Sequence, residues 1–219
     1  NYKSLNIYKY GFSNNSDIQA KIVKKNKDGI IFDVEIKSLN KKNSFIRNIN
    51  FPLIGNHNVE NALAAISVCI NFKINKSIIK NSLETFRGVK RRLTKIYDNN
   101  EIIFFDDYAH HPTEIRETLK ALKSKSGRLI SVIQPHRYSR LNENYGNFIK
   151  SLRDADVSII LPIFSAGEIK IKGINSLNLT KDINKKKYTK AYYASNFLKA
   201  KNKLNQILKP KDTVVFMGA

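Results

Sequence analysis

The sequence predicts an α/β protein in which a doubly wound domain with a parallel sheet follows a smaller region of antiparallel strands and helices. Short apolar runs alternate with amphipathic segments from Glu101 onward, and this alternation is typical of βαβ units in a parallel sheet. The first fifty or so residues instead alternate apolar and polar side chains, as antiparallel strands with one solvated face do. Polar residues and glycines directly follow several apolar runs, which puts them at the sheet edge where ligands bind.

The first region reads as a hairpin followed by helices. A turn-forming stretch at residues 26–29 separates two alternating runs, and after Gly55 the apolar period changes from that of a strand to that of a helix. The expected elements are strands over residues 17–25, 30–38 and 45–53 and helices over residues 57–72 and 76–86.

The second region is expected to form the parallel sheet. The expected elements are strands over residues 102–105, 128–134, 157–161 and 213–217 and helices over residues 112–124, 138–152 and 196–208. We place the domain boundary between residues 88 and 89, which gives domains of residues 1–88 and 89–219.

Composition limits the class of protein. The chain has 219 residues, 42% of them hydrophobic and 10% aromatic, enough to bury a sizeable core in one or two domains. No apolar run is long enough to span a bilayer and no basic-then-apolar leader begins the sequence, so we expect a cytoplasmic protein with no membrane partner. The single cysteine, Cys69, excludes an internal disulfide and fits a reducing compartment.

The formal net charge of +21 favours an anionic partner, either nucleic acid or a phosphorylated small molecule. The lysines are scattered, however, in short clusters beside Asn, Asp or Gly at residues 24–25, 41–42 and 185–187. We therefore expect a solvated basic surface and no nucleic-acid partner. A basic nucleic-acid-binding α/β module stays open as an alternative.

Two short segments, one in the first region and one just after the boundary, have both structural and functional interpretations. Asn58 and Asn61 share one face at a helix start. They either cap the helix, which we favour from the sequence, or read the edge of a planar base with their carboxamides. The cations that precede Leu93, among them Arg91 and Arg92, either complement a helix C-terminus or clamp a phosphate.

The segment over residues 106–114 follows an apolar run and is rich in ionisable side chains. Pro112 suits the first turn of a helix, which makes His111 the expected N-cap. Two carboxylates and two imidazoles, including Asp107 and His110, crowd the gap between strand and helix, an arrangement that is costly unless it binds something. The spacing matches no recognised metal motif, so we expect no metal site here and favour ribose hydroxyls as ligands.

Basic residues and glycines follow three further strands. His136, Arg137 and Arg140 come after one buried run and form a candidate anion site for a carboxylate or phosphate. Gly167 and Glu168 come after the next strand, and a glycine follows the last one. Four strands thus deliver polar or glycine positions to one edge.

Five motifs in this order resemble the Mur ligase family: GNHNVENALAA at residues 55–65, GVKRR at 88–92, DDYAHHPTE at 106–114, PHRYSR at 135–140 and AGE at 166–168. The resemblance implies a Rossmann-like C-terminal domain preceded by part of a central ATP-binding domain. It also implies ATP-dependent amide formation through an acyl phosphate in peptidoglycan synthesis. The substrates implied are UDP-N-acetylmuramate and L-alanine, with ATP and Mg²⁺ as cofactors.

The resemblance also implies residue roles. Asn58 and Asn61 would contact adenine, Arg91 and Arg92 the terminal phosphate, and Asp107 the ribose. The catalytic residues would be His110, His136 and Arg137, and the substrate-binding residues would be Tyr108, His111, Arg140, Gly167 and Glu168.

The chain departs from the family pattern at its phosphate loop. It contains no glycine-rich loop ending in Gly-Lys-Thr or Gly-Lys-Ser, and the usual magnesium ligands are expected outside it. We therefore expect a fragment that is inactive alone and binds ATP weakly at best. The alternatives within the doubly wound fold are the family member that joins recycled tripeptide to UDP-N-acetylmuramate and a non-catalytic nucleotide-binding domain. The PHRYSR motif favours the family member that uses L-alanine over the one that uses the tripeptide.

Overall fold

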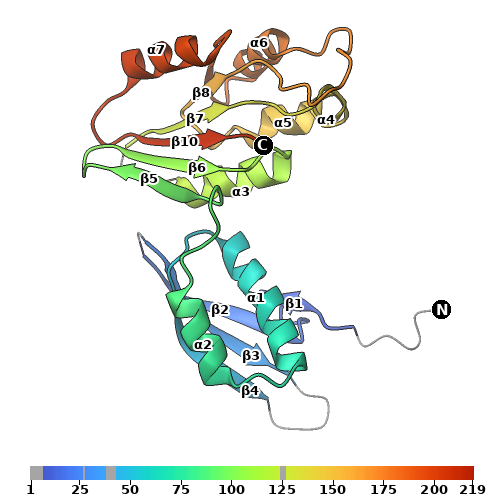
Figure 1. The fold of residues 1–219 in the computed structure, drawn as a ribbon, viewed down its shortest axis with the longest axis vertical. Coiled ribbons are helices and arrows are strands. Elements are labelled where there is room, and N and C mark those ends of the chain that lie inside the picture. Colours follow the sequence, from blue (N-terminus) through green and yellow to red (C-terminus); the bar gives the residue numbers. More distant parts are fainter. Residues whose placement is uncertain (1–6, 27, 38–42, 124–126) are drawn as a thin grey trace, which may run out of the picture. The chain divides into compact units, whose positions relative to one another are not determined.

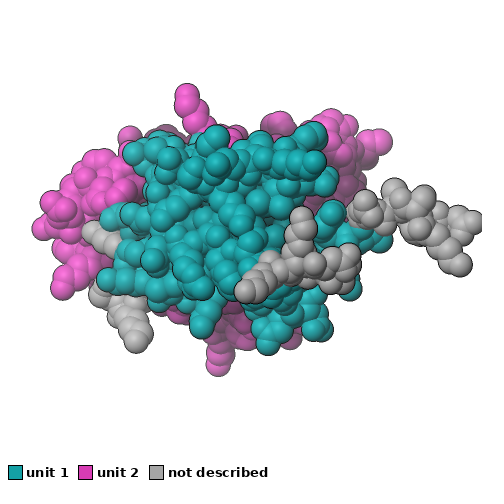
Figure 2. Space-filling view, turned by 90° about the horizontal axis from the view of Figure 1, so that it is seen from below, with its two compact units in different colours: residues 1–88 teal, residues 89–219 magenta. Residues whose placement is uncertain are grey.

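The computed structural model describes residues 7–26, 28–37, 43–123 and 127–219. The chain divides into two compact units, Asn1–Gly88 and Val89–Ala219, which Figure 2 distinguishes by colour. The predicted ends of a strand at Ser38 and of a helix at Ser124, and the lysine cluster at residues 41–42, lie outside the described residues. None of the helices in the described ranges is long and apolar enough to cross a membrane.

The first unit is a four-stranded sheet covered by two helices (Figure 1). Its elements are β1 (Tyr10–Gly11), β2 (Ile18–Lys25), β3 (Ile30–Ile36), β4 (Ser44–Phe51), α1 (Asn56–Asn71) and α2 (Lys76–Thr85). The strands β2, β3 and β4 pair antiparallel, whereas the short β1 runs parallel to β2. The predicted hairpin and both helices are therefore confirmed, and β1 was not predicted.

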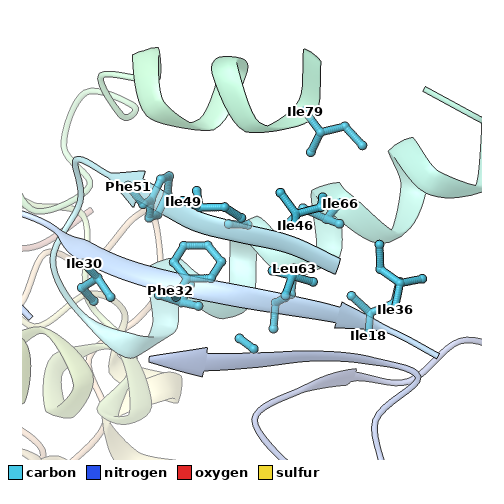
Figure 3. Packing of buried hydrophobic residues seen from close by; sticks show 14 residues of the cluster. Ile18, Ile30, Phe32, Ile36, Ile46, Ile49, Phe51, Leu63, Ile66 and Ile79 are labelled. Atoms are coloured by element: carbon cyan, nitrogen blue, oxygen red, sulfur yellow. The ribbon is translucent and has the colours of Figure 1, made fainter. Parts of the chain in front are cut away.

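The core of the first unit lies between the strands and the helices (Figure 3). Along β3 every second residue is buried, because the period of a strand is two. Phe32 has no exposed surface and packs edge to face on Phe51, with 6.0 Å between the ring centroids. Leu63 and Ile66 of α1 complete this cluster.

The second unit is a six-stranded sheet in the order β5-β6-β10-β7-β8-β9. Its strands are β5 (Thr94–Asp98), β6 (Ile103–Asp107), β7 (Leu129–Ile133), β8 (Val157–Ile160), β9 (Lys190–Tyr193) and β10 (Thr213–Met217). All neighbours pair parallel except β5 and β6. The last strand, β10, lies between β6 and β7, so the carboxyl ends of β6, β10, β7 and β8 lie next to one another.

Five helices connect or flank these strands: α3 (Pro112–Leu122), α4 (Tyr138–Glu143), α5 (Tyr145–Ser151), α6 (Ser176–Lys186) and α7 (Phe197–Ile207). Residues of α7 pack with Ile130, Ile159 and Val214 on one face of the sheet, and α3 packs against β7 and α5. The mixed α/β architecture with its parallel sheet confirms the predicted fold class.

The predicted single helix over residues 138–152 is wrong. The structure has α4 and α5 instead, and the residue between them, Asn144, has φ −113° and ψ 16°. Its side chain donates to the carbonyl of Arg140 at 3.1 Å, and such local bonds compete with helix continuation. The elements β5, α6 and β9 were also not predicted.

Candidate functional site

The loops that leave the carboxyl ends of β6, β10 and β7 are tied together by hydrogen bonds. The amide of Gly218 donates to the carbonyl of Asp107 at 3.3 Å, and the amide of Gln134 donates to the carbonyl of Met217 at 3.0 Å. Arg91 donates from its guanidinium to the carbonyl of Gly218 at 2.6 Å. The edge is thus one connected surface formed by segments far apart in the sequence.

A row of four rings, which we call the ring row, runs along this edge: Tyr108, His110, His136 and Phe164. Adjacent centroids are 5.2 Å apart from Tyr108 to His110, 5.7 Å apart from His110 to His136 and 5.4 Å apart from His136 to Phe164. The row joins the loops after β6, β7 and β8. It therefore brings the two predicted catalytic histidines, His110 and His136, into contact.

Two guanidinium groups stand over the first ring of the row. Arg91 and Arg92 lie 5.2 Å and 5.5 Å from the centroid of Tyr108, within range of a cation–π interaction. Arg91 is also 3.5 Å from a carboxylate oxygen of Asp106, and Arg92 is 3.9 Å from one of Glu114. Both arginines are exposed, so an anionic ligand could replace these weak pairs.

Asp107 is buried and organises the loops around it. Its carboxylate accepts from the amide of Leu93 at 2.8 Å and from the amide of Ala109 at 2.7 Å, and it is 4% exposed. These bonds hold the segment of Arg91 beside the end of β6. The structure thus gives Asp107 a backbone role, and its predicted ribose contact stays a prediction.

The start of α3 follows the predicted cap. His111 is the N-cap, its Nδ1 accepts from the amide of Thr113 at 3.3 Å, and Pro112 is the first helical residue. Glu114 accepts from the amides of His110 and His111, both at 3.1 Å. Burial alone would raise the pKa of Glu114, but these two amides and the charges of His110 and Arg92 hold it below its usual value.

The two histidines present different ring nitrogens. Nδ1 of His110 is 2.9 Å from the carbonyl oxygen of Tyr108, which can only accept, so this bond needs a proton on Nδ1. Nδ1 of His136 is 3.3 Å from the guanidinium of Arg140, which can only donate, so here Nδ1 is the acceptor. When both rings are neutral, Nε2 of His110 is an acceptor and Nε2 of His136 is a donor.

Burial lowers the pKa of His136, and the positive charges of Arg140, His110 and Arg137 lower it further, against the opposing effect of Glu168. The imidazole of His136 therefore stays neutral at a pH where an ordinary histidine begins to gain a proton. A neutral ring keeps the bond from Arg140, because a proton on Nδ1 would remove its acceptor.

The loop after β8 supports the start of α4. The carboxylate of Glu168 accepts from the amide of Ser139 at 3.0 Å and from its hydroxyl at 2.7 Å, and the amide bond, followed by the hydroxyl bond, lowers the pKa of Glu168. Gly167 is exposed with φ +84°, which favours glycine. Arg137, the N-cap of α4, is exposed with φ +69°.

The first unit holds the remaining predicted site residues. Asn58 is buried, and its carboxamide donates to the carbonyl of Ile54 at 2.8 Å, whereas Asn61 is exposed on α1. Gly55 is the N-cap of α1 and no side chain caps this end. The capping interpretation of the two asparagines is therefore wrong, and their adenine contact stays a prediction.

Sequence reasoning missed three features of this edge. Phe164 closes the ring row, Ser139 donates to Glu168, and Arg91 donates to the carbonyl of Gly218. The only signal for Phe164 was an aromatic residue shortly after a buried strand. In the part of the chain that the structure describes, no group of three or more His, Cys, Asp or Glu side chains is placed to hold a metal ion.

Comparisons with known proteins cover both units. The family model described as "Mur ligase, glutamate ligase domain" matches residues 91–219, and the "Mur ligase middle domain" model matches residues 1–69. The UDP-N-acetylmuramate–L-alanine ligase of Pelagibacter ubique is 41% identical over 99% of this chain and 47% of its own length. That of Sulfurihydrogenibium sp. is 38% identical over 100% of this chain and 46% of its own. The chain thus spans about half the length of these relatives.

Solved structures agree on the fold. A UDP-N-acetylmuramate-alanine ligase from Thermotoga maritima matches with a TM-score of 0.72 at 24% identity, over 96% of this chain and 44% of its own. A murein peptide ligase from Psychrobacter arcticus matches with a TM-score of 0.64 at 26% identity, over 96% of this chain and 42% of its own.

Proposed function

Because the chain belongs to the Mur ligase family, we propose that the protein containing it joins L-alanine to the carboxylate of UDP-N-acetylmuramate at the expense of ATP. The reaction serves peptidoglycan synthesis in the cytoplasm. Many relatives named UDP-N-acetylmuramate–L-alanine ligase are 35–41% identical to this chain over nearly its whole length. The observation in favour is the carboxyl edge of the second unit, where His110, His136 and Arg140 lie together beside exposed arginines.

The chemistry needs an activated carboxylate, because a free carboxylate is a poor electrophile. A muramyl carboxylate oxygen attacks the γ-phosphorus of ATP, the bond to the β-phosphate oxygen breaks, and ADP leaves. The amine of L-alanine then attacks the acyl phosphate carbon, and the tetrahedral intermediate expels phosphate while the amine loses a proton.

Residues at the edge match the charges that this reaction produces. Arg91 and Arg92 could exchange their exposed carboxylate pairs for the terminal phosphate, since guanidinium suits phosphate oxygens. Arg137 and Arg140 would bind the carboxylate of L-alanine. We propose that Nε2 of His110 accepts the proton that the amine loses, and that Nε2–H of His136 donates a stabilising hydrogen bond to the reacting group. Both roles agree with the partners of the two Nδ1 atoms.

Mg²⁺ commonly accompanies ATP and would neutralise its phosphate charges. Among the described residues no group of three or more His, Cys, Asp or Glu side chains could hold a metal ion, and we expect the protein ligands of Mg²⁺ outside this chain. We assign no step to the ion.

The experiment is a phosphate-release assay on the complete protein. We expect release that requires both UDP-N-acetylmuramate and L-alanine. Release with the free tripeptide in place of L-alanine would instead identify the recycling ligase. No release with either amine would contradict the proposal.

A further inference from the structure

Phe164 is a large apolar residue at the edge of the site with 51% of its surface exposed. Its ring stacks on the imidazole of His136 with an interplanar angle of 22° and 5.4 Å between centroids. Exposure of an aromatic ring gains nothing for the core of the second unit. The contact that the exposed ring does make is the one with the imidazole of His136.

The backbone reinforces this contact. The amide of Phe164 donates to the carbonyl of Pro135 at 2.8 Å, and the amide of Arg137 donates to the carbonyl of Phe164 at 2.8 Å. These bonds form a parallel β-bridge between His136 and Phe164. They fix the loops after β7 and β8 against each other at the position of the imidazole.

Two further groups contact the imidazole. Arg140 donates to Nδ1, and His110 lies 5.7 Å away at a tilt of 52°. With Nδ1 held by Arg140 and the ring plane held by Phe164, the direction of Nε2–H is fixed. The charged and titratable groups that act on His136 are Arg137, Arg140, His110 and Glu168.

We propose that Phe164 is a positioning residue for His136: its aromatic plane holds the imidazole in the orientation that directs Nε2–H to the reacting group. The contribution to turnover rests on the function proposed above, whereas the contact between the two rings does not.

The direct test is the histidine titration of the chain by nuclear magnetic resonance, with the His136 signal assigned from its loss in His136→Gln. In Phe164→Leu water gains access to the imidazole, so the midpoint of His136 should rise toward the ordinary value of about 6.5. Phe164→Met should act alike, and Phe164→Tyr should restore the original midpoint. Phe197→Leu, at a 68% exposed ring on α7, is the matched control.

An unchanged His136 midpoint in folded Phe164→Leu or Phe164→Met would overturn the proposal. A midpoint in Phe164→Tyr as high as in Phe164→Leu would do the same, because an aromatic plane is then not what matters.

In the complete enzyme, Phe164→Leu should lower kcat/KM for the amino acid roughly tenfold through loss of alignment, with the KM for ATP unchanged and Phe164→Tyr near normal. Absence of ligase activity in the unmodified protein would refute the proposed function and leave the titration result standing. Normal kinetics in Phe164→Leu would refute the positioning role alone.

Discussion

Asp107 shows how a residue that looks like a ligand contact can be part of the framework. Its carboxylate accepts from two backbone amides in a buried setting. Replacement by Ala leaves those amides without this acceptor, so we expect Asp107→Ala to lower the free energy of unfolding by about 2–3 kcal/mol.

The matched control for Asp107 is its neighbour Asp106, whose side chain is 30% exposed and 3.5 Å from Arg91. Asp106→Ala should cost below about 1 kcal/mol. Urea unfolding monitored by circular dichroism measures both variants. Equal losses would contradict the structural role of Asp107.

Glu114, in the cap of α3, makes the stability of the fold depend on pH. Its pKa is lowered on folding, so its contribution to stability is complete above the usual value of 4.5 and is lost as the pH falls through the folded-state pKa. Stability measured by urea unfolding should decline below about pH 4.5, and less steeply in Glu114→Gln. Glu143→Gln, an exposed carboxylate of α4, is the control, and a decline unchanged by Glu114→Gln would exclude the cap as its source.

At the scale of elements, one ion pair joins the ends of three of them. Arg128, just before β7, donates twice to Asp212, at 3.0 Å and 2.6 Å, and once to the carbonyl of Ile207 at the end of α7. Asp212 immediately precedes β10, and its side chain is 1% exposed. The pair therefore fixes the register in which β10 enters between β6 and β7.

Removal of one partner leaves a buried charge uncompensated. We expect Arg128→Ala to lower the free energy of unfolding by about 3 kcal/mol, and Arg128→Lys to restore only part because lysine lacks the planar fork. Thermal unfolding compares these variants with Arg153→Ala, an exposed arginine after α5. A loss in Arg128→Ala no larger than that of this control would show that the pair is dispensable.

Elements were predictable where local patterns decide them. The hairpin of β2 and β3 followed from alternation and a turn, and the cap at His111 followed from Pro112 and Glu114. The break at Asn144 was missed because apolar spacing continues through it, and its cause is a side-chain bond to the backbone. The short strand β5 is largely exposed, so its sequence lacks the apolar run that revealed β6.

This chain folds into two compact units, each with its own core. Units of this kind usually unfold separately unless a large apolar interface couples them. Phe32→Ala removes a fully buried ring from the first unit and should cost that unit about 3–5 kcal/mol.

Hydrogen exchange followed by mass spectrometry reads the two units at once. In Phe32→Ala we expect faster exchange in β2, β3 and β4, with protection in β6, β7 and β10 retained. Equal loss of protection in both units would mean that they unfold as one.

For the site, the sequence indicated which strands would end together but not which side chains would touch. Parallel pairing was enough to bring the segments of His110 and His136 to one edge. The stacking of Phe164 depends on the path of two loops that only the folded chain specifies. The roles of Asn58, Asn61, Gly167 and the other predicted ligand contacts stay predictions.

The central proposal is that the carboxyl edge of the second unit binds the amino acid and takes a proton from its amine. Its most direct test is the KM for L-alanine of the complete protein with Arg137→Ala, beside Arg153→Ala as the matched control. We predict a rise of roughly 10- to 100-fold in Arg137→Ala from the loss of a charge-assisted contact, with the KM for ATP unchanged and Arg153→Ala normal. A normal KM for L-alanine in Arg137→Ala would contradict the account.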